Sequence, residues 1–251
     1  MIAGEGACLV CGQPLEYATH PVEMECFFCH QKVQSYARCA KGHFICDKCH
    51  AQLGSNSALS ICLRSASKNP VGILQEMMAD PHVHMHGPEH HVMVGCALIT
   101  AAHNAGASFD LRMALLEMNA RGGNYPGGAC GFWGCCGAAV SVGMAISIMT
   151  GATPLSGKAW GLANSGTAQA LKAIGAIGGP RCCKRNSFTA IREAAPFFAG
   201  RLGIRLEMPE KIACAYSPEN QQCLRKACPY YQEQPLRNSS AFALKPMNAL
   251  H

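Results

Sequence analysis

Apolar residues recur at helical spacing along most of the chain after residue 70. Such spacing places the apolar side chains on one face of a helix. The predicted helices cover residues 71–78, 92–103, 110–120, 134–149, 157–174 and 187–202. Ser187 is the expected N-cap of the last helix, and Glu193 and Arg201 are expected to face outward. Gly-rich turns at residues 121–128 and 178–180 separate several of these elements.

Few stretches alternate apolar and polar residues with the period of a strand. The expected fold class is therefore mainly α, with a small N-terminal zinc-binding module followed by an all-helical domain. Residues 1–52 are expected to form the module and residues 53–69 a linker or short helix. Residues 70–231 are expected to form the helical, cysteine-rich domain, and residues 232–251 a weakly ordered tail.

The composition is that of a globular protein, with 49% hydrophobic and 14% charged residues among 251. The net charge of +6 permits an anionic partner without requiring one. Residues 129–154 are apolar for long enough to span a bilayer. They consist mostly of small residues and have no basic cluster beside them, so we interpret them as a buried helix and expect no membrane partner.

Seventeen cysteines are the main chemical feature of the chain. Dense cysteines indicate either a secreted disulfide scaffold or an intracellular metal protein. Residues 1–6 have no basic start or apolar run typical of a secretory signal. Several of the cysteines also form Cys-x-x-Cys pairs, a common zinc spacing. We therefore expect a cytoplasmic protein whose thiols bind metal.

The N-terminal module holds eight candidate metal ligands, enough for two four-coordinate sites. They are Cys8, Cys11, Cys26, Cys29, Cys39, His43, Cys46 and Cys49. Sequential pairing would join the first four and the last four. Cross-brace pairing would join Cys8 and Cys11 with Cys39 and His43, which leaves the other four for the second site. The sequence alone leaves both pairings open.

The run from Cys39 to Cys49 resembles the middle of RING-type fingers, which are cross-braced. With all positions filled by protein ligands, both sites would be closed, so we expect two structural Zn²⁺ ions. A protein partner could dock on such a module. Nucleic acid is a weaker candidate partner, because basic residues form no stripe and aromatics make up only 7% of the chain.

Residues 82–91 contain five histidines and one carboxylate. Such a segment can bind metal or move protons. It can equally be a polar turn in which Pro88 and Glu89 begin the next helix. Among His84, His86, His90 and His91, we favour His86 as a functional residue, with His90 as a second catalytic candidate.

The second cysteine group has no Cys-x-x-Cys spacing. It includes Cys130, Cys135, Cys136, Cys182, Cys183, Cys214, Cys223 and Cys228. A single cysteine in a Gly- and Ala-rich core is usually a small hydrophobic residue, as we expect for Cys62 and Cys96. Two doublets beside glycine turns and basic residues instead favour ligands or reactive thiols. Adjacent cysteines rarely bind the same metal, so one of each doublet should have another role.

Three motifs resemble the catalytic alpha domain of iron–sulfur L-serine dehydratases. They are the glycine-flanked Cys130, the Gly-Ala-Thr-Pro turn at residues 151–154, and the run Cys182-Cys183-Lys184-Arg185-Asn186. The resemblance covers residues 85–195 and implies that Cys130 and Cys182 are cluster ligands. The family's middle ligand has no counterpart, because the region around Leu171 holds no cysteine. The chain also resembles uncharacterised cysteine-rich proteins of anaerobic microbes.

Candidates for the remaining cluster ligands are Cys136, Cys183, Cys214, Cys223 and Cys228. An iron–sulfur cluster with three protein thiolates keeps one iron open as a Lewis acid. The first functional hypothesis is therefore a lyase that eliminates water or sulfide from a small hydroxy- or thiol-bearing amino acid.

In that hypothesis His86 or His90 would act as the base. Lys184 and Arg185 could lower the pKa of the thiols or hold the substrate carboxylate, with Arg185 favoured for the carboxylate. The alternative hypothesis is an accessory protein that carries sulfur or metal on its cysteine doublets. Its zinc module would dock a protein or tRNA partner.

Overall fold

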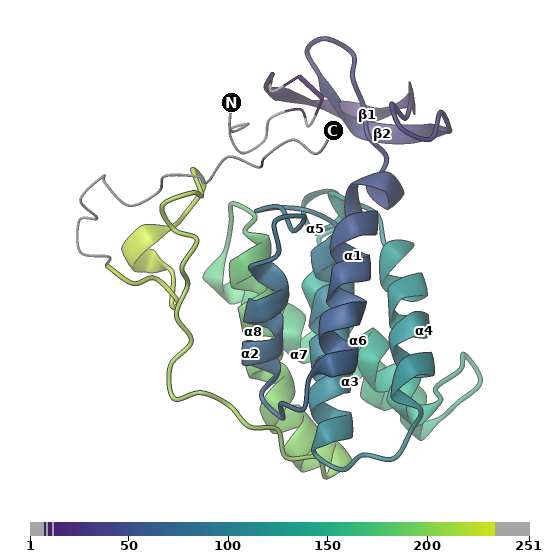
Figure 1. The fold of residues 1–251 in the computed structure, drawn as a ribbon, viewed down its shortest axis with the longest axis vertical. Helices are drawn as coiled ribbons and strands as arrows, with labels where there is room; N and C mark the ends of the chain where they lie inside the picture. Colours follow the sequence, from purple (N-terminus) through teal and green to yellow (C-terminus); the bar gives the residue numbers. More distant parts are fainter. Residues whose placement is uncertain (1–7, 9, 12, 234–251) are drawn as a thin grey trace, which may run out of the picture.

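Helices form most of the described chain, which confirms the mainly α prediction. The structure is a computed structural model that describes residues 8, 10, 11 and 13–233. Figure 1 shows a bundle of helices with a two-stranded sheet at one end of it. The helices provide the apolar core, and the sheet belongs to the cysteine-rich N-terminal module.

The two antiparallel strands are β1 (Leu15–Glu25) and β2 (Lys32–Cys39). The helices are α1 (Asp47–Arg64), α2 (Pro70–Met78), α3 (Glu89–Asn104), α4 (Leu111–Gly123), α5 (Ala129–Phe132), α6 (Gly137–Thr150), α7 (Lys158–Ile177) and α8 (Cys183–Phe197). A π-helical turn, η1 (Phe198–Leu202), extends α8, and a 3₁₀ turn, η2 (Arg225–Ala227), lies near the end of the described chain.

Local capping explains several helix ends. The Asn69 side chain accepts hydrogen bonds from the backbone N–H groups of Val71 and Gly72, and Pro70 occupies the first position of α2. The Asp110 carboxylate caps α4 in the same way. α6 ends where Gly151 adopts a left-handed φ of 61°, which favours glycine. These ends agree with the predicted helices to within a few residues.

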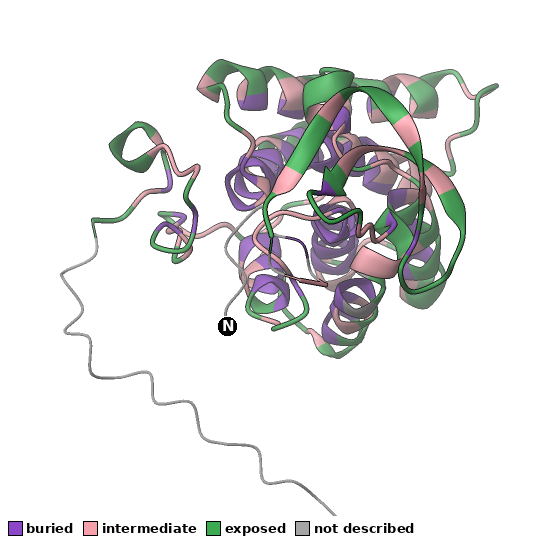
Figure 2. Ribbon diagram, turned by 90° about the horizontal axis from the view of Figure 1, so that it is seen from above, coloured by how far each residue is buried: buried purple, intermediate pink, exposed green. Residues whose placement is uncertain are grey.

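The core is centred on α3, which is buried along most of its length. It packs against α1, α2, α4, α6 and α8. Figure 2 shows buried residues concentrated on these helices, whereas the sheet is mostly exposed. α6 supplies the buried apolar helix predicted within residues 129–154. Within the described ranges, no helix is both long and apolar enough to cross a membrane.

The contact between α6 and α7 depends on Gly143. A Cβ atom here would crowd the Thr167 hydroxyl and lie 2.9 Å from the Ala163 carbonyl oxygen. We expect Gly143→Ala to lower the free energy of unfolding by about 1–3 kcal/mol, because overpacking outweighs the better helix propensity of alanine. Gly161→Ala in α7 has open space and should be neutral or stabilising by up to about 1 kcal/mol. Urea unfolding of both variants tests this, and equal effects would contradict it.

Two features differ from the sequence predictions. α1 extends through most of residues 53–69, and its Ala58, Ile61 and Cys62 belong to the core, so this interval is more than a connector. Ser187 is not an N-cap: it is buried inside α8, which begins four residues earlier. The N-cap is Cys182, whose Sγ accepts a hydrogen bond from the Arg185 N–H. Most of the predicted tail, residues 234–251, lies outside the described residues.

Candidate metal centres

The eight N-terminal ligands adopt the cross-brace pairing. Cys8, Cys11, Cys39 and His43 form one group, and Cys26, Cys29, Cys46 and Cys49 form the other. Within each group the ligand atoms lie within 4.8 Å of one another. The hairpin explains this pairing, because Cys26 follows β1 directly and Cys39 ends β2. Both groups therefore have the donor set and the spacing to hold a metal ion.

Backbone N–H groups donate hydrogen bonds to the thiols and favour their deprotonated form. The N–H of Lys41 donates to Cys39 Sγ at 3.2 Å, and the N–H of Cys46 donates to Cys26 Sγ at 3.3 Å. Burial would raise the pKa of Cys26, but backbone N–H donors lower it to about 6. The balance is the same at Cys39, whose pKa also falls to about 6. Both thiols therefore favour the thiolate form that binds metal.

The module is docked on the helical bundle through specific contacts. Tyr36 of β2 stacks on Phe132 of α5, with ring centroids 4.2 Å apart. Asp47, the first residue of α1, accepts a hydrogen bond from the Gly127 N–H at 2.5 Å. Tyr17 of β1 accepts one from Arg181 at 2.8 Å. The module therefore covers the two loops that carry the cysteine doublets.

The N-termini of α1, α3, α6 and α8 meet at this same end of the bundle. His50 of α1 faces Glu89 of α3, with Nδ1 and Oε2 3.6 Å apart. In α8, Asn186 donates a hydrogen bond to the Sγ of Cys136, the N-cap of α6. Helix N-termini carry a partial positive charge that stabilises thiolates and other anions. The bundle therefore gathers the reactive side chains in a field suited to negative charge.

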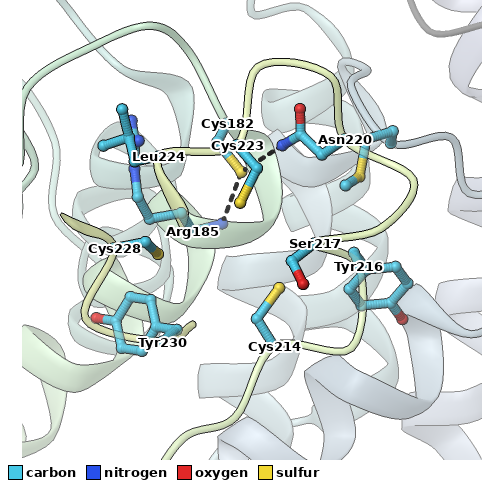
Figure 3. Close-up of a pocket in the computed structure, with 11 residues that line it drawn as sticks. Cys182, Arg185, Cys214, Tyr216, Ser217, Asn220, Cys223, Leu224, Cys228 and Tyr230 are labelled. Carbon is cyan, nitrogen blue, oxygen red and sulfur yellow. Dashed lines mark hydrogen bonds between the residues drawn. The ribbon is translucent and has the colours of Figure 1, made fainter. Parts of the chain in front are cut away.

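Four cysteines from distant parts of the sequence line one pocket. They are Cys182, Cys214, Cys223 and Cys228. Figure 3 shows their side chains around a common space, together with Asn220, Ser217 and Tyr216. The four sulfurs are spaced more widely than those of the N-terminal groups. Within the described residues, no three of them have sulfur atoms that all lie within 4.8 Å of one another.

Hydrogen bonds hold the pocket together, although residues 203–224 have no helix or extended strand. Cys182 Sγ accepts from the Asn220 amide at 3.3 Å and from the Arg185 N–H at 3.4 Å (Figure 3). The Arg225 N–H donates to Cys223 Sγ. Such N–H donors stabilise metal-bound thiolates. A long irregular segment organised around thiols is typical of a functional site.

A buried polar group lies beside this pocket. It contains Glu89, His90 and Lys184, each at most 1% exposed, together with the half-buried His86. His86 Nε2, His90 Nε2 and Lys184 Nζ have no hydrogen-bond partner among the described residues. Because buried polar atoms are nearly always paired, these atoms are candidates for contacting a ligand.

Hydrogen bonds assign different roles to the two histidines. His90 Nδ1 lies 3.0 Å from the Gly87 carbonyl oxygen, so Nδ1 carries the proton and Nε2 presents a lone pair. His86 Nδ1 accepts from the Cys183 N–H, so the proton of this ring is on Nε2. Burial lowers the pKa of His86 to about 4 and that of His90 to about 3. Both rings are therefore neutral near pH 7, one as an acceptor and the other as a donor.

The buried polar residues include one carboxylate, Glu89, and one ammonium, Lys184. Burial would raise the pKa of Glu89, but His50 beside it lowers the pKa to about 2, so this carboxylate is ionised. Burial lowers the pKa of Lys184 to about 8, opposed by Glu89 and by the thiols of Cys183, Cys182 and Cys214. The Lys184 ammonium lies over the Tyr216 ring, 4.7 Å from its centroid.

The structure regroups the predicted cluster ligands. Cys182, Cys223 and Cys228 line the pocket together with Cys214, whereas Cys130 does not, so Cys130 and Cys182 do not share this site. Cys136 and Cys183 do not line this pocket either. Two adjacent residues, Cys182 and Cys183, thus have different surroundings. Cys62 and Cys96 are buried in the core, as expected.

Arg185 differs most from its predicted role. Its side chain is 3% exposed and donates hydrogen bonds to the carbonyl oxygens of Gly178 and Pro180 and to Asn186 Oδ1. These bonds hold the turn before α8, so they do not leave the guanidinium free to hold a substrate carboxylate. Lys184 is the better candidate cation, and its burial could not be read from the sequence.

The model of one protein family, described as a family of unknown function (DUF5714), matches residues 59–231. The chain belongs to the DUF5714 family. No curated protein and no solved structure matches the chain. The resemblance to serine dehydratases therefore stays a prediction.

The limits of the DUF5714 match separate the two kinds of site. The match begins within α1, after the last N-terminal ligand, and ends at Tyr231. It thus includes the four-cysteine pocket and the buried histidines but none of the eight ligands of the module. The pocket and the histidines are the part of the site that belongs to the DUF5714 region.

Proposed function

We propose that this protein is an iron–sulfur enzyme with its cluster in the pocket of Cys182, Cys214, Cys223 and Cys228. The convergence of four thiols from three chain segments on one pocket is the observation that carries this proposal. Their wider spacing favours a multi-iron cluster over a single ion, for which the N-terminal groups are already suited. All-thiolate ligation with N–H donors to sulfur is typical of iron–sulfur sites.

The reaction that we propose is elimination of water or sulfide from a small hydroxy- or thiol-bearing amino acid. His90 Nε2 would take the proton from carbon, because it presents a buried, unpaired lone pair. His86 Nε2–H and the Lys184 ammonium are donors that can orient a carboxylate. With three of the four thiols as ligands, the cluster would keep one iron free to supply Lewis acidity, which makes the hydroxyl or thiol a better leaving group.

Electron transfer is the second candidate function, and the fourth cysteine favours it. A cluster bound by four protein thiolates has no iron open to a substrate. Removing one thiol distinguishes the two functions: elimination should survive in one of the four single-cysteine variants, whereas a redox cluster should need all four.

The test of the cluster is metal and sulfide analysis of the full chain purified without air. We expect iron, acid-labile sulfide and absorbance near about 400 nm. Alanine at Cys182, Cys214 or Cys228 should lower the iron content severalfold, whereas Cys135→Ala, a half-buried cysteine outside the pocket, should not. A colourless wild-type protein that holds only zinc would overturn the proposal.

The test of the reaction is incubation of the loaded protein with L-serine and L-cysteine, with 2-oxo acid and sulfide as the measured products. His90→Asn keeps a donor toward the Gly87 carbonyl but lacks the base, so it should slow turnover by about 100-fold or more. His20→Asn, at an exposed position of β1, is the control. Equal rates in both variants would exclude His90 as the base.

For the N-terminal module, we propose two structural Zn²⁺ ions, because both groups are closed by four S or N ligands. Phe27 and Phe28 are 50% and 63% exposed between Cys26 and Cys29, which supports the docking of a protein partner there.

The accessory function in sulfur or metal transfer remains the alternative, with Cys136 and Cys183 as carriers in a cytoplasmic protein. Labelled persulfide on either thiol would support it.

A further inference from the structure

Lys184 has an unusual environment for a lysine. It is one of the largest fully buried side chains and is 1% exposed. Its ammonium has no hydrogen-bond partner within residues 13–233. The salt bridges of the described residues do not include Lys184. Burying a cation without a partner is costly unless opposite charge is nearby. Some negative charge should therefore offset this lysine in the working protein.

The Glu89 carboxylate meets this need only in part. It interacts with Lys184 through space. Its Oε1 accepts a hydrogen bond from the His84 N–H at 3.1 Å, and the Lys184 ammonium itself has no hydrogen-bond partner among the described residues. The other groups that interact with Lys184 are thiols, those of Cys182, Cys183 and Cys214. Two of these three cysteines line the four-cysteine pocket.

Lys184 lies next to residues that line the same pocket. It is the second residue of α8, next to Cys183 and two residues after the pocket ligand Cys182. Its ammonium lies over Tyr216, which also lines the pocket. The ammonium therefore contacts a residue of the pocket lining, at a site that is closed to water. A buried charge at such a place acts through space with little screening.

We propose that Lys184 is the counter-charge of the cluster in the four-cysteine pocket and raises its reduction potential. This inference rests on the proposed iron–sulfur function. Thiolate-bound clusters are anionic, and gaining one electron makes them more so. A fixed buried cation stabilises the reduced form more than the oxidised form, and net charge near a cluster is one of the factors that set its potential.

The experiment is a one-electron spectroelectrochemical titration of the anaerobically purified full chain, in which the electrode supplies the electron. Lys184→Met removes the charge at similar length and should shift the potential to more negative values at unchanged iron content. Lys184→Arg keeps the charge and should stay near wild type. Lys172→Met removes an exposed lysine of α7 and should also leave the potential unchanged.

A second measurement covers variants that do not load. Without the cluster, Lys184→Met should unfold at a higher urea concentration than wild type, because it removes an unpaired buried charge. Failure of Lys184→Met to hold iron, with loading restored in Lys184→Arg, supports the counter-charge role. Failure of both variants points to steric damage and overturns it.

The two proposals fail differently. A wild-type protein without iron or sulfide would overturn the cluster proposal and this inference together. A wild-type protein with a cluster, combined with a Lys184→Met variant of unchanged potential, would overturn only the role of Lys184.

Discussion

Removing the metal ions from the two N-terminal groups is expected to unfold the β1–β2 hairpin and leave the helical bundle folded. No residue of β1 is buried, and Cys39 is the only buried residue of β2. A segment with so little buried apolar surface depends on metal for its stability. In small zinc domains, this contribution is on the order of 10 kcal/mol.

Hydrogen exchange of the full chain before and after chelation measures this effect. We expect amides of residues 15–39 to lose protection, whereas the interior of α3 should keep it. Cys46→Ser should remove one of the two proposed zinc ions and have a similar local effect. Cys62→Ser, in a core cysteine that contacts no metal group, serves as the control for a cysteine change as such. Unchanged protection of the hairpin after chelation would show that it folds without metal.

The helices could be predicted from the sequence because their apolar faces are long and their ends carry clear signals. Asn69 before Pro70 and Gly151 after α6 are such signals, and both serve as caps in the structure. The predicted start of α8 was wrong because the N-cap is Cys182, through its thiol, whereas Ser187 is a more typical capping residue. The strands were missed because their alternating pattern is weak and almost none of their residues are buried.

The N-terminal ligands were predictable from local spacing, and the structure adds the choice of the cross-brace. The four-cysteine pocket was harder to predict, because its four cysteines come from positions 182 to 228 without a shared motif. Cys182 and Cys183 separate because neighbouring residues at a helix start point in different directions. No local signal links Cys214 to Cys182, since only the return of the chain from α8 brings them together.

Lowering the pH from 7 to 5 is expected to destabilise the protein through its buried histidines. Burial holds the pKa of His90 at about 3, whereas in the unfolded chain a histidine has a pKa of about 6.5. Below pH 6.5 the unfolded state therefore binds a proton that the folded state does not. The free energy of unfolding then falls by up to about 1.4 kcal/mol per pH unit, until the pH approaches the folded pKa.

Between pH 7 and 5, His90 alone should thus cost about 2 kcal/mol. Urea unfolding at both pH values, in wild type and in His90→Asn, isolates this contribution, because asparagine does not titrate and can still donate to the Gly87 carbonyl. Release of metal in acid affects both proteins alike, so the difference between their pH dependences reports on His90. An equal loss of stability in the two proteins would mean that His90 takes up its proton in the folded state as readily as in the unfolded chain, and it would contradict this prediction.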